Sequence, residues 1–534
     1  MSIMSSERFG TRHRKFEGAA REARALSVSR SALLRQVGLV VILTALAKVA
    51  AFAKDVLLSL KFGAGPMTDA YFIANTIPGF VFGGVFATIG MVFLPAFKRA
   101  LFEDDFAAST TYRTAVVVYT ALSAVLGALT FLGAGIIVSM LAPSLPNQTR
   151  DLAVLMTRIM AFSFVFSGWV GLQNAVLQSH KLLIWPQVVQ LLSHMFVIGG
   201  LVLATMTNGS IMLLVYAAVI GWMVVAPLIS LRAAEFWPKA SGMWFDRRTA
   251  WSMAALSFPV FLSLSLDQAS ILIGTYLGSS FPVGAVSHLN YASRLVVLLS
   301  SVFSLVIAYV LFPYLTESII AKRVVQARRY IALALIAVLL FSAPMMVVGL
   351  SMSEALISFV FQRGAFRPED AAASGLVLAY LAPVIILAGI REVLNRLFLA
   401  WQQTGVLLLF GVLAMVVNMV ASVYFSDRMG LEGIALGSTC GALVYVVAQV
   451  SMILLRHGAL FHRDLPLWLG LITVASLTAA LAGGWVQGRV IFANARLDFL
   501  LDVITVFATF GVIIAMAILA SARIRGIYKT EPEA

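Results

Sequence analysis

The sequence is poor in charge and almost free of cysteine. Only 12% of its 534 residues are charged, about half of the roughly 25% that soluble globular proteins carry. Cys440 is the single cysteine, so the chain forms no internal disulfide. We expect its small side chain to pack within an apolar segment. A composition this low in charge excludes a soluble enzyme.

The sequence also lacks a long hydrophilic segment in which a catalytic or nucleotide-binding domain would fold. The patterns GxxxxGKS/T, HExxH and CxxC, which mark phosphate, zinc and redox sites, are absent. These absences exclude an ATP-driven pump for this chain alone. We expect no enzymatic activity, no cofactor and no metal site.

Apolar sequence dominates instead: 61% of the residues are hydrophobic and the mean hydropathy is +0.96. Apolar runs of about twenty or more residues recur, enough to cross about 30 Å of hydrocarbon. A transmembrane barrel would show alternating segments of about ten residues. We therefore predict an all-α polytopic membrane protein with about fourteen transmembrane helices. The expected spans cover residues 37–60, 69–97, 113–141, 151–178, 182–205, 210–231, 250–277, 283–315, 329–350, 371–399, 404–426, 430–455, 465–487 and 498–522.

The basic residues, whose excess gives a net charge of +14, are distributed unevenly along the chain. Of the 38 lysines and arginines, 25 lie in the termini and in the connections on the same side, seven in the opposite connections and six within spans. Basic residues gather in cytoplasmic loops, so we expect both termini in the cytoplasm. The charge therefore indicates membrane orientation, and no nucleic-acid partner is expected. Residues 1–36 form a basic tail suited to contact with anionic lipid.

Charged residues within the spans are the first candidates for function. Each costs roughly 2.5–3.5 kcal/mol near the middle of a bilayer, so such residues face a protein interior or an aqueous cavity. We expect them to mark a polar path through the molecule. They are Lys48, Lys54, Asp55, Arg158, Asp267, Arg294, Arg391, Glu392 and Arg396.

Lys48, Lys54 and Asp55 belong to the first expected span. Six helical positions correspond to about 600°, so Lys48 and Lys54 lie about 120° apart and can border one wide cavity. Asp55 points about 100° away from Lys54, which lets it orient that lysine or pair with a cation on a neighbouring helix. The alternative is that Lys54 and Asp55 extend to the outer membrane interface.

Arg294 lies about a third of the way into the span 283–315. Its permanently charged, planar guanidinium suits phosphate oxygens, so we predict a contact with substrate. The alternative is a buried ion pair with Asp267 on the preceding span. Asp267 is itself the candidate for coupling, by titration or by binding a cation.

The other polar residues within the spans have structural interpretations. We expect Arg391, Glu392 and Arg396 to form salt bridges near a helix end, and Arg158 to have a similar structural role. His194 is expected to be a hydrogen-bonded core histidine.

The expected cavity holds more cations than anions, and prolines interrupt four spans at Pro78, Pro259, Pro344 and Pro383. Broken helices and a midplane site are typical of alternating-access transporters. A positive cavity attracts phosphate and repels metal cations. These features favour transport of an anionic substrate.

Several segments resemble the MurJ/MviN family of lipid II flippases, whose members carry S-R-x-x-G-x-x-R-D followed by FGAG and TDAFF. This chain reads LAKVAAFAKD at 46–55, FGAG at 62–65 and TDAYF at 68–72. Further matches are LNYASRL at 289–295, LFP at 311–313 and QRGAF at 362–366. The matches fall at corresponding spans, and the resemblance covers the whole chain in order and span number.

The resemblance implies the fold of the MOP superfamily, with two six-helix lobes, here 37–231 and 250–455. Two further helices within 465–522 would form a groove for a lipid tail, before a cytoplasmic tail at 523–534. The implied function is to flip lipid II, a polyprenyl-diphosphate-linked saccharide, from the inner to the outer leaflet of the bacterial cytoplasmic (inner) membrane. Partners would be this substrate, membrane lipids and envelope-synthesis proteins. The residues implied to bind substrate are Lys48, Lys54, Asp55, Asp69 and Arg294.

The sequence departs from the family at three basic positions. The family has a basic pair after P-N-L-L in the second span, where this chain reads PGFVFG at 78–83, and it has arginines where Lys48 and Lys54 stand. Lysine keeps the charge but loses the bidentate fork, so the diphosphate is expected to be held less rigidly. The alternatives are a flippase for an exopolysaccharide or O-antigen unit, a drug/cation antiporter of the same superfamily, and a non-transporting envelope-assembly scaffold. The antiporter would need acidic residues to dominate the cavity.

Overall fold

The structure is a computed structural model that describes residues 30–239, 241–306, 312–321, 323–457, 465–487 and 495–520. Within these ranges every regular element is a helix. Most of the expected N-terminal tail, the expected C-terminal tail and the first residue of the LFP segment lie outside the described residues. The side chain of Asp267 also lies outside what the structure describes.

The first half of the chain forms one lobe of antiparallel helices. A π-helical turn, η1 (Val81–Phe86), joins α3 and α4 into one long column. The short 3₁₀-helix η2 (Ala234–Phe236) ends the lobe. Its α-helices are α2 (Arg30–Phe62), α3 (Pro66–Phe80), α4 (Ala87–Glu103), α5 (Asp105–Leu141), α6 (Asn147–Ala161), α7 (Ser163–Ser179), α8 (Ile184–Met206) and α9 (Met212–Ala233).

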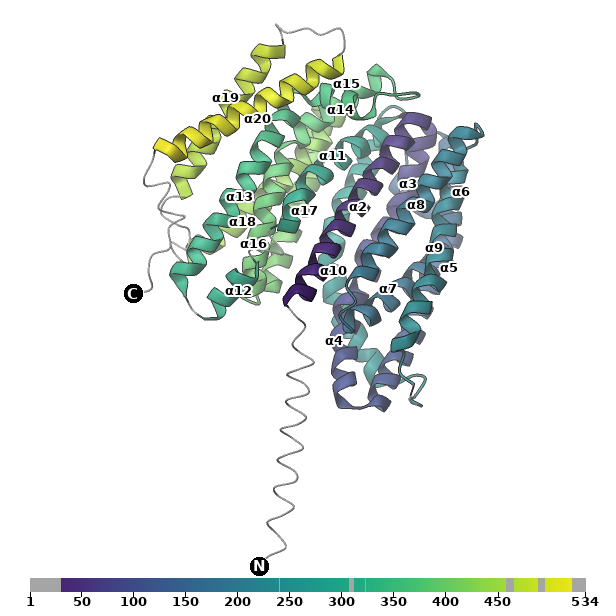
Figure 1. Ribbon diagram of the computed structural model, residues 1–534. Coiled ribbons are helices and arrows are strands. Elements are labelled where there is room, and N and C mark those ends of the chain that lie inside the picture. Colours follow the sequence, from purple (N-terminus) through teal and green to yellow (C-terminus); the bar gives the residue numbers. More distant parts are fainter. Residues whose placement is uncertain are drawn as a thin grey trace, which may run out of the picture.

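The second half forms a second lobe with two additional helices, α19 (Leu465–Gln487) and α20 (Ala495–Ala520), along its flank (Figure 1). The lobe consists of α10 (Arg247–Gly278), α11 (Ala285–Val306), α12 (Phe312–Ile320), α13 (Val324–Ser351), α14 (Ser353–Phe361), α15 (Pro368–Leu381), α16 (Pro383–Ala400), α17 (Thr404–Met429) and α18 (Leu431–His457).

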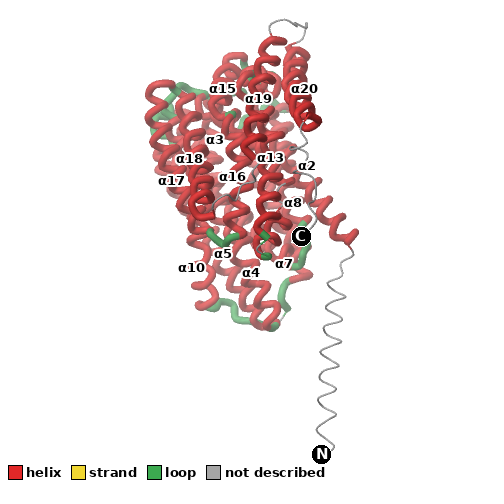
Figure 2. Tube along the Cα trace, turned by 90° about the vertical axis from the view of Figure 1, so that its left-hand side faces the viewer, coloured by secondary structure: helices red, strands yellow, loops and turns green. Residues whose placement is uncertain are grey.

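The helices account for the predicted spans. In the described part of the chain, eleven helices are long and apolar enough to cross a membrane, and the pair α6 and α7, bent by 40°, forms a twelfth span. α2 and α11 take the places of the first and eighth expected spans, which completes the fourteen. The axes of most of these helices are roughly aligned with one another, as both views show (Figure 1 and Figure 2). The all-α polytopic fold is therefore confirmed.

Apolar packing holds each lobe together. In the first lobe α8 packs along α2 and α9, and α6 packs against α3 and α5. In the second lobe α17 packs on α18, and α13 packs on α16 and α19. Trp468 of α19 is completely buried in the same core as Phe398 and Phe410, so the additional helix pair is anchored to the second lobe.

α10 contacts both lobes. It packs against α4, α5 and η1, and its Met253 belongs to a core of the first lobe. Further along, Ser270 Oγ accepts a hydrogen bond from Asn418 Nδ2 of α17 (2.9 Å). On the side of the first lobe, Gly83 of the π-helical turn lies against the Gln268 side chain of α10, and a Cβ atom at Gly83 would lie 2.7 Å from Gln268 Nε2.

The connection between the lobes is bound to α5. Thr110 and Thr114 accept hydrogen bonds from the backbone nitrogens of Met243 (3.1 Å) and Asp246 (3.0 Å). Asp246 in turn caps the first turn of α10 by accepting from the side chain and backbone of Thr249, and these bonds lower the pKa of its carboxyl. We call the end of the molecule with residues 237–246 the linker end.

Candidate functional site between the lobes

The centre of the site is an ion-paired group formed by α2 and α11. Asp55 Oδ1 lies 3.3 Å from Lys54 Nζ, and Asp55 Oδ2 lies 3.7 Å from Arg294 Nε. Asp55 therefore both orients the adjacent lysine and answers a cation on a neighbouring helix, the two roles that the sequence had left open. Both Lys54 and Asp55 are buried, so they do not extend to the membrane interface.

Arg294 differs from its partners in its exposure. Its side chain remains 38% exposed, whereas that of Asp55 is 4% exposed. α11 packs against α2 and α3 of the first lobe and against α15 and α16 of the second, so Arg294 lies between the lobes. Its acidic partner is Asp55. The side chain of Asp267 lies outside what the structure describes, so the alternative pairing with Asp267 stays a prediction.

Lys48 lies six residues before Lys54, slightly less than two helical turns and about 9 Å along the axis of α2. It is half-buried, and no ion pair is found for it in the part of the chain that the structure describes. Lys48, Lys54 and Arg294 bring three positive charges to this region against the single carboxylate of Asp55. The described group therefore has an excess of two positive charges.

His194 of α8 lies beside this group, which the sequence analysis did not predict. The imidazole is half-buried and lies within electrostatic range of Lys54, Asp55 and Arg294. Among the described residues it makes no hydrogen bond. The expectation of a hydrogen-bonded core histidine was wrong, because α8 packs along α2 and brings the ring next to the charged residues.

Asp69 has a different environment. Its buried carboxylate accepts hydrogen bonds from the backbone nitrogens of Gly284 (2.6 Å) and Ser287 (2.8 Å) and from the Ser287 hydroxyl (2.6 Å). It therefore caps the N-terminus of α11, where a negative charge also stabilises the helix dipole. Asp69 joins the two lobes, and its acceptor positions are occupied by protein donors.

Neighbouring residues strengthen this junction. Leu60 O accepts from Ala365 N (2.9 Å), and Gly63 O accepts from the Tyr291 hydroxyl (3.0 Å). Gly63 and Gly364 adopt positive φ angles of 64° and 61°. A Cβ on Gly63 would meet the backbone of Ala365, and a Cβ on Gly364 would meet the backbone of Leu60 at the end of α2. We call this region, residues 60–69, 284–291 and 361–366, the sealed end.

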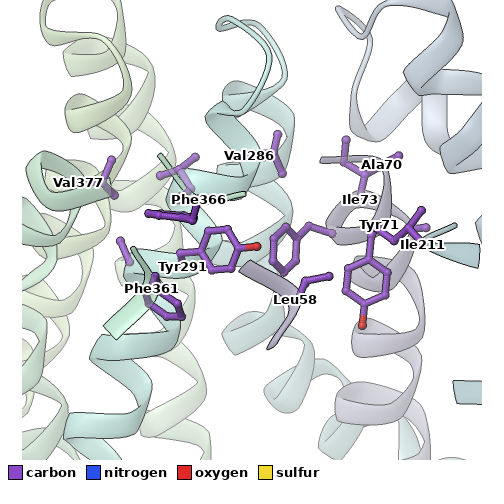
Figure 3. Close-up of a cluster of buried hydrophobic side chains, with 14 of the residues drawn as sticks. Leu58, Ala70, Tyr71, Ile73, Ile211, Val286, Tyr291, Phe361, Phe366 and Val377 are labelled. Carbon is purple, nitrogen blue, oxygen red and sulfur yellow. The ribbon is translucent and has the colours of Figure 1, made fainter. Parts of the chain in front are cut away.

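Aromatic packing completes the sealed end. Tyr291 is fully buried, with its ring centroid 5.1 Å from that of Phe361, 5.3 Å from that of Phe366 and 5.4 Å from that of Phe72. Figure 3 shows Tyr291 between Phe361 and Phe366 on one side and Leu58 on the other. The FGAG, TDAYF, LNYA and QRGAF segments thus meet in one interlobe contact.

Phe82 and Gly83 stand in the second span where the family has a basic pair, and both pack against neighbouring side chains. The Phe82 ring lies 5.5 Å from Trp222 and 5.8 Å from both Phe86 and Phe164, measured between centroids. Gly83 lies against the side chain of Gln268 on α10. This part of α3–η1–α4 adds no charge to the site.

The remaining polar residues within the spans lie elsewhere. Arg396 donates to Glu392 Oε1 from Nε (3.1 Å) and from an Nη atom (2.6 Å), which confirms the expected salt bridge. Arg391 lies over the ring of Tyr445, 5.5 Å from its centroid. Arg158 is exposed on α6, near the bend before α7. Within the described residues no group of three or more His, Cys, Asp or Glu side chains could hold a metal ion.

Comparison with solved structures places the fold. An inward closed conformation of the lipid II flippase MurJ aligns with a TM-score of 0.78 and 20% sequence identity, covering 90% of this chain and 99% of that chain. An inward-facing multidrug resistance MATE family transporter of the MOP superfamily aligns with a TM-score of 0.65 and 14% identity, covering 79% of this chain and 98% of that chain. At these identities the likeness establishes the fold.

Comparison with protein sequences places the family. A protein of Synechocystis sp. named "Probable lipid II flippase MurJ" is 24% identical over 508 residues, 90% of this chain and 93% of the relative. The "Lipid II flippase MurJ" of Burkholderia cenocepacia is 26% identical over 420 residues, 75% of this chain and 79% of the relative. The sequence model described as "Lipid II flippase MurJ" matches residues 58–521. Since this match spans most of the chain, including α3 to α20, the chain belongs to the MurJ family.

Proposed function

We propose that this protein is a lipid II flippase, which moves the lipid-linked peptidoglycan precursor from the inner to the outer leaflet of the bacterial inner membrane. The observation that carries the proposal is Arg294, a partly exposed guanidinium within a span that shares the carboxylate of Asp55 with Lys54. A charged group in this position is costly, so its presence marks a functional site. Translocation changes no covalent bond, so the proposal includes no enzymatic activity.

The charges of the site fit a diphosphate. A polyprenyl diphosphate attached to a saccharide carries two negative charges, one on each phosphate. Lys48, Lys54 and Arg294, offset by Asp55, supply an excess of two positive charges. Arg294 is suited to bind two phosphate oxygens at once, and the lysines act as point charges. We leave Asp69 out of the proposed substrate contacts because its carboxylate is engaged in capping α11.

The orientation of the proposed cycle follows from the basic residues. Because the termini and the connections on their side carry most of the lysines and arginines, both termini are assigned to the cytoplasm and the sealed end to the outer face. Substrate then enters from the linker end and leaves after the sealed end opens, as in alternating access. Asp267 remains the candidate for coupling.

The lipid tail needs a place outside the saccharide site. We assign it to α19 and α20, which pack on the flank of the second lobe and keep apolar side chains such as Leu477 and Leu481 exposed. The lobes are then 37–231 and 250–455, with α10 in contact with both. Membrane lipids compete for this surface, and envelope-synthesis proteins remain candidate partners.

The proposal is tested by depleting the protein in its native bacterium and measuring the transbilayer distribution of lipid-linked precursors. We expect lipid II to accumulate in the inner leaflet and the chain to rescue a strain that lacks its own lipid II flippase. If all such lipids keep their normal distribution, the proposal is wrong. Rescue by a variant with Lys48, Lys54 and Arg294 all neutralised would instead favour a scaffold.

A second substrate is favoured by one observation. Phe82 and Gly83, which pack against Trp222 and Gln268, replace the basic pair of the second span, and this leaves fewer cations for the diphosphate. This change favours a different saccharide, such as an exopolysaccharide or O-antigen unit, on the same polyprenyl diphosphate. Trapping of that lipid rather than lipid II after depletion would identify it. A drug/cation antiporter fits less well, because the described site is dominated by cations.

A further inference from the structure

α8 carries a stripe of polar side chains that are not among the proposed substrate contacts. Gln187, Gln190 and His194 follow each other at intervals of three and four residues, which places them on one face of the helix. None of the three is buried. Ser193, by contrast, donates back to Val189 O within the helix (2.9 Å), so its hydroxyl is already satisfied. The stripe ends at His194, beside the ion-paired group.

The His194 imidazole is available to a ligand. It is only half-buried and has no hydrogen-bond partner among the described residues, although it lies in the middle of a membrane-spanning helix. Its N–H donor is therefore not engaged by the protein and can reach a polar ligand between the helices. α8 packs along α2, which carries Lys54 and Asp55, and the charges of Lys54, Asp55 and Arg294 all act on the ring. A ligand that binds Lys54 and Arg294 therefore comes within reach of this ring.

We propose that His194 donates a hydrogen bond to a phosphate oxygen of the polyprenyl diphosphate, as a contact additional to Lys54 and Arg294. The proposal rests on the proposed function, since it names a further residue for the same substrate. An imidazole carries at least one N–H donor in either protonation state. The contact therefore does not depend on titration of the ring, and a bond to an ionised phosphate is stronger than one between neutral groups.

The test uses the full chain in lipid nanodiscs and undecaprenyl diphosphate as the probe. We expect His194→Ala to weaken binding about tenfold, the loss typical of one hydrogen bond to a charged group. His194→Gln keeps an N–H donor and should recover part of the affinity. Ser193→Ala, on the same turn of α8, should bind like the original protein. Undecaprenol, which lacks phosphate, should bind all four proteins equally.

The outcomes separate this inference from the proposed function. If the original protein does not bind undecaprenyl diphosphate, the proposed function itself fails. If it binds and folded His194→Ala binds equally well, the contact made by His194 is refuted. An equal loss of undecaprenol binding would also refute it, because the histidine would then act on the lipid tail. Should His194→Ala fail to fold, His194→Phe, which keeps a ring but has no N–H donor, takes its place, and equal affinities of folded His194→Phe and Ser193→Ala refute the contact.

Discussion

Asp55 determines which charged residues of the candidate site are needed for stability and which can be replaced to test binding. Its carboxylate is buried and accompanied by Lys54 and Arg294 at 3.3 and 3.7 Å. Removing one partner of a buried ion pair costs about 3–5 kcal/mol, because the other charge is left uncompensated. Loss of Asp55 would leave buried Lys54 unpaired. Loss of Arg294 leaves Asp55 its lysine, so Arg294 is the residue whose replacement reports on function.

We predict that Arg294→Ala abolishes rescue of a flippase-deficient strain and slows lipid II flipping at least about tenfold, since a contact to a charged phosphate is worth about 1.5–3 kcal/mol. Arg294→Lys should keep part of the activity, because it retains the charge without the planar fork. Flipping in proteoliposomes measures both. Arg158→Ala is the control, because Arg158 lies exposed on α6 and its replacement should have little effect. Full activity of Arg294→Ala would remove Arg294 from the site.

Asp69 should behave as a structural residue. Asp69→Ala removes three hydrogen bonds at the buried N-terminus of α11, so we predict a loss of about 3 kcal/mol or more in the free energy of unfolding. Unfolding titrations in mixed micelles measure this loss, with Asp151→Ala, an exposed acidic residue of α6, as the control. Weaker binding of diphosphate at unchanged stability would instead make Asp69 a substrate contact.

The site could be predicted in part from residue types. Charges in apolar spans identify Lys48, Lys54, Asp55 and Arg294, because burial of charge is costly wherever it occurs. The pairing of Asp55 with Arg294 could not be predicted, since 239 positions separate them along the chain. His194 was misassigned for the same reason. Its spacing from Gln187 and Gln190 was a signal for a polar helix face, but only the packing of α8 on α2 shows what that face meets.

At the scale of elements, small residues determine how closely helices approach. Gly433, Gly437 and Gly441 repeat every four residues on α18, a spacing that favours close helix contact in membranes. At Gly437 a Cβ atom would lie 2.5 Å from Ser422 N and 2.6 Å from Ser422 Cα of α17. Backbone at this distance cannot move aside as a flexible side chain could. The contact between α17 and α18 therefore depends on glycine.

We predict that Gly437→Ala lowers the free energy of unfolding by about 1–3 kcal/mol, the usual cost of overpacking, and separates α17 from α18. The control is Gly405→Ala at the start of α17, where no atom lies within 4 Å of an added Cβ. Unfolding titrations of both variants under the same conditions test this difference. Equal stability of the two variants would show that the contact between α17 and α18 does not depend on glycine at position 437.

The spans could be predicted because long apolar runs in a bilayer admit one structure, the helix. The breaks within them could be predicted only in part. The break between α15 and α16 falls at Pro383 as expected, whereas α10 and α13 continue through Pro259 and Pro344.

Pro78 marks the second span, yet the π-helical turn begins three residues later at Val81, where Gly83 meets α10. The bend between α6 and α7 contains no proline at all. These deviations depend on contacts between helices rather than on local sequence.

At the scale of the whole molecule, the sealed end lies over the candidate site. Asp55 lies seven residues before the end of α2 and Arg294 nine residues after the start of α11, which places both about 10–14 Å beneath the sealed end. Most of the segments that resemble the family form this seal. Among them, only Arg294 and the residues of the first span are proposed to contact the substrate. The role of the other segments is then to close one path to the charged group, and transport requires the seal to open.

A reversible cross-link tests that requirement. Thr68 of α3 and Ser287 of α11 face each other across the lobes with their hydroxyl oxygens 2.9 Å apart, close enough for a disulfide after small adjustment. In a Cys440→Ser background, we predict that oxidised Thr68→Cys/Ser287→Cys protein flips no lipid II in proteoliposomes and that a reductant restores the activity. Either single cysteine variant should be insensitive to oxidant, because it leaves the lobes unlinked. Undiminished flipping by the fully oxidised double variant would show that substrate leaves without separation of α3 from α11, and would exclude alternating access through this end.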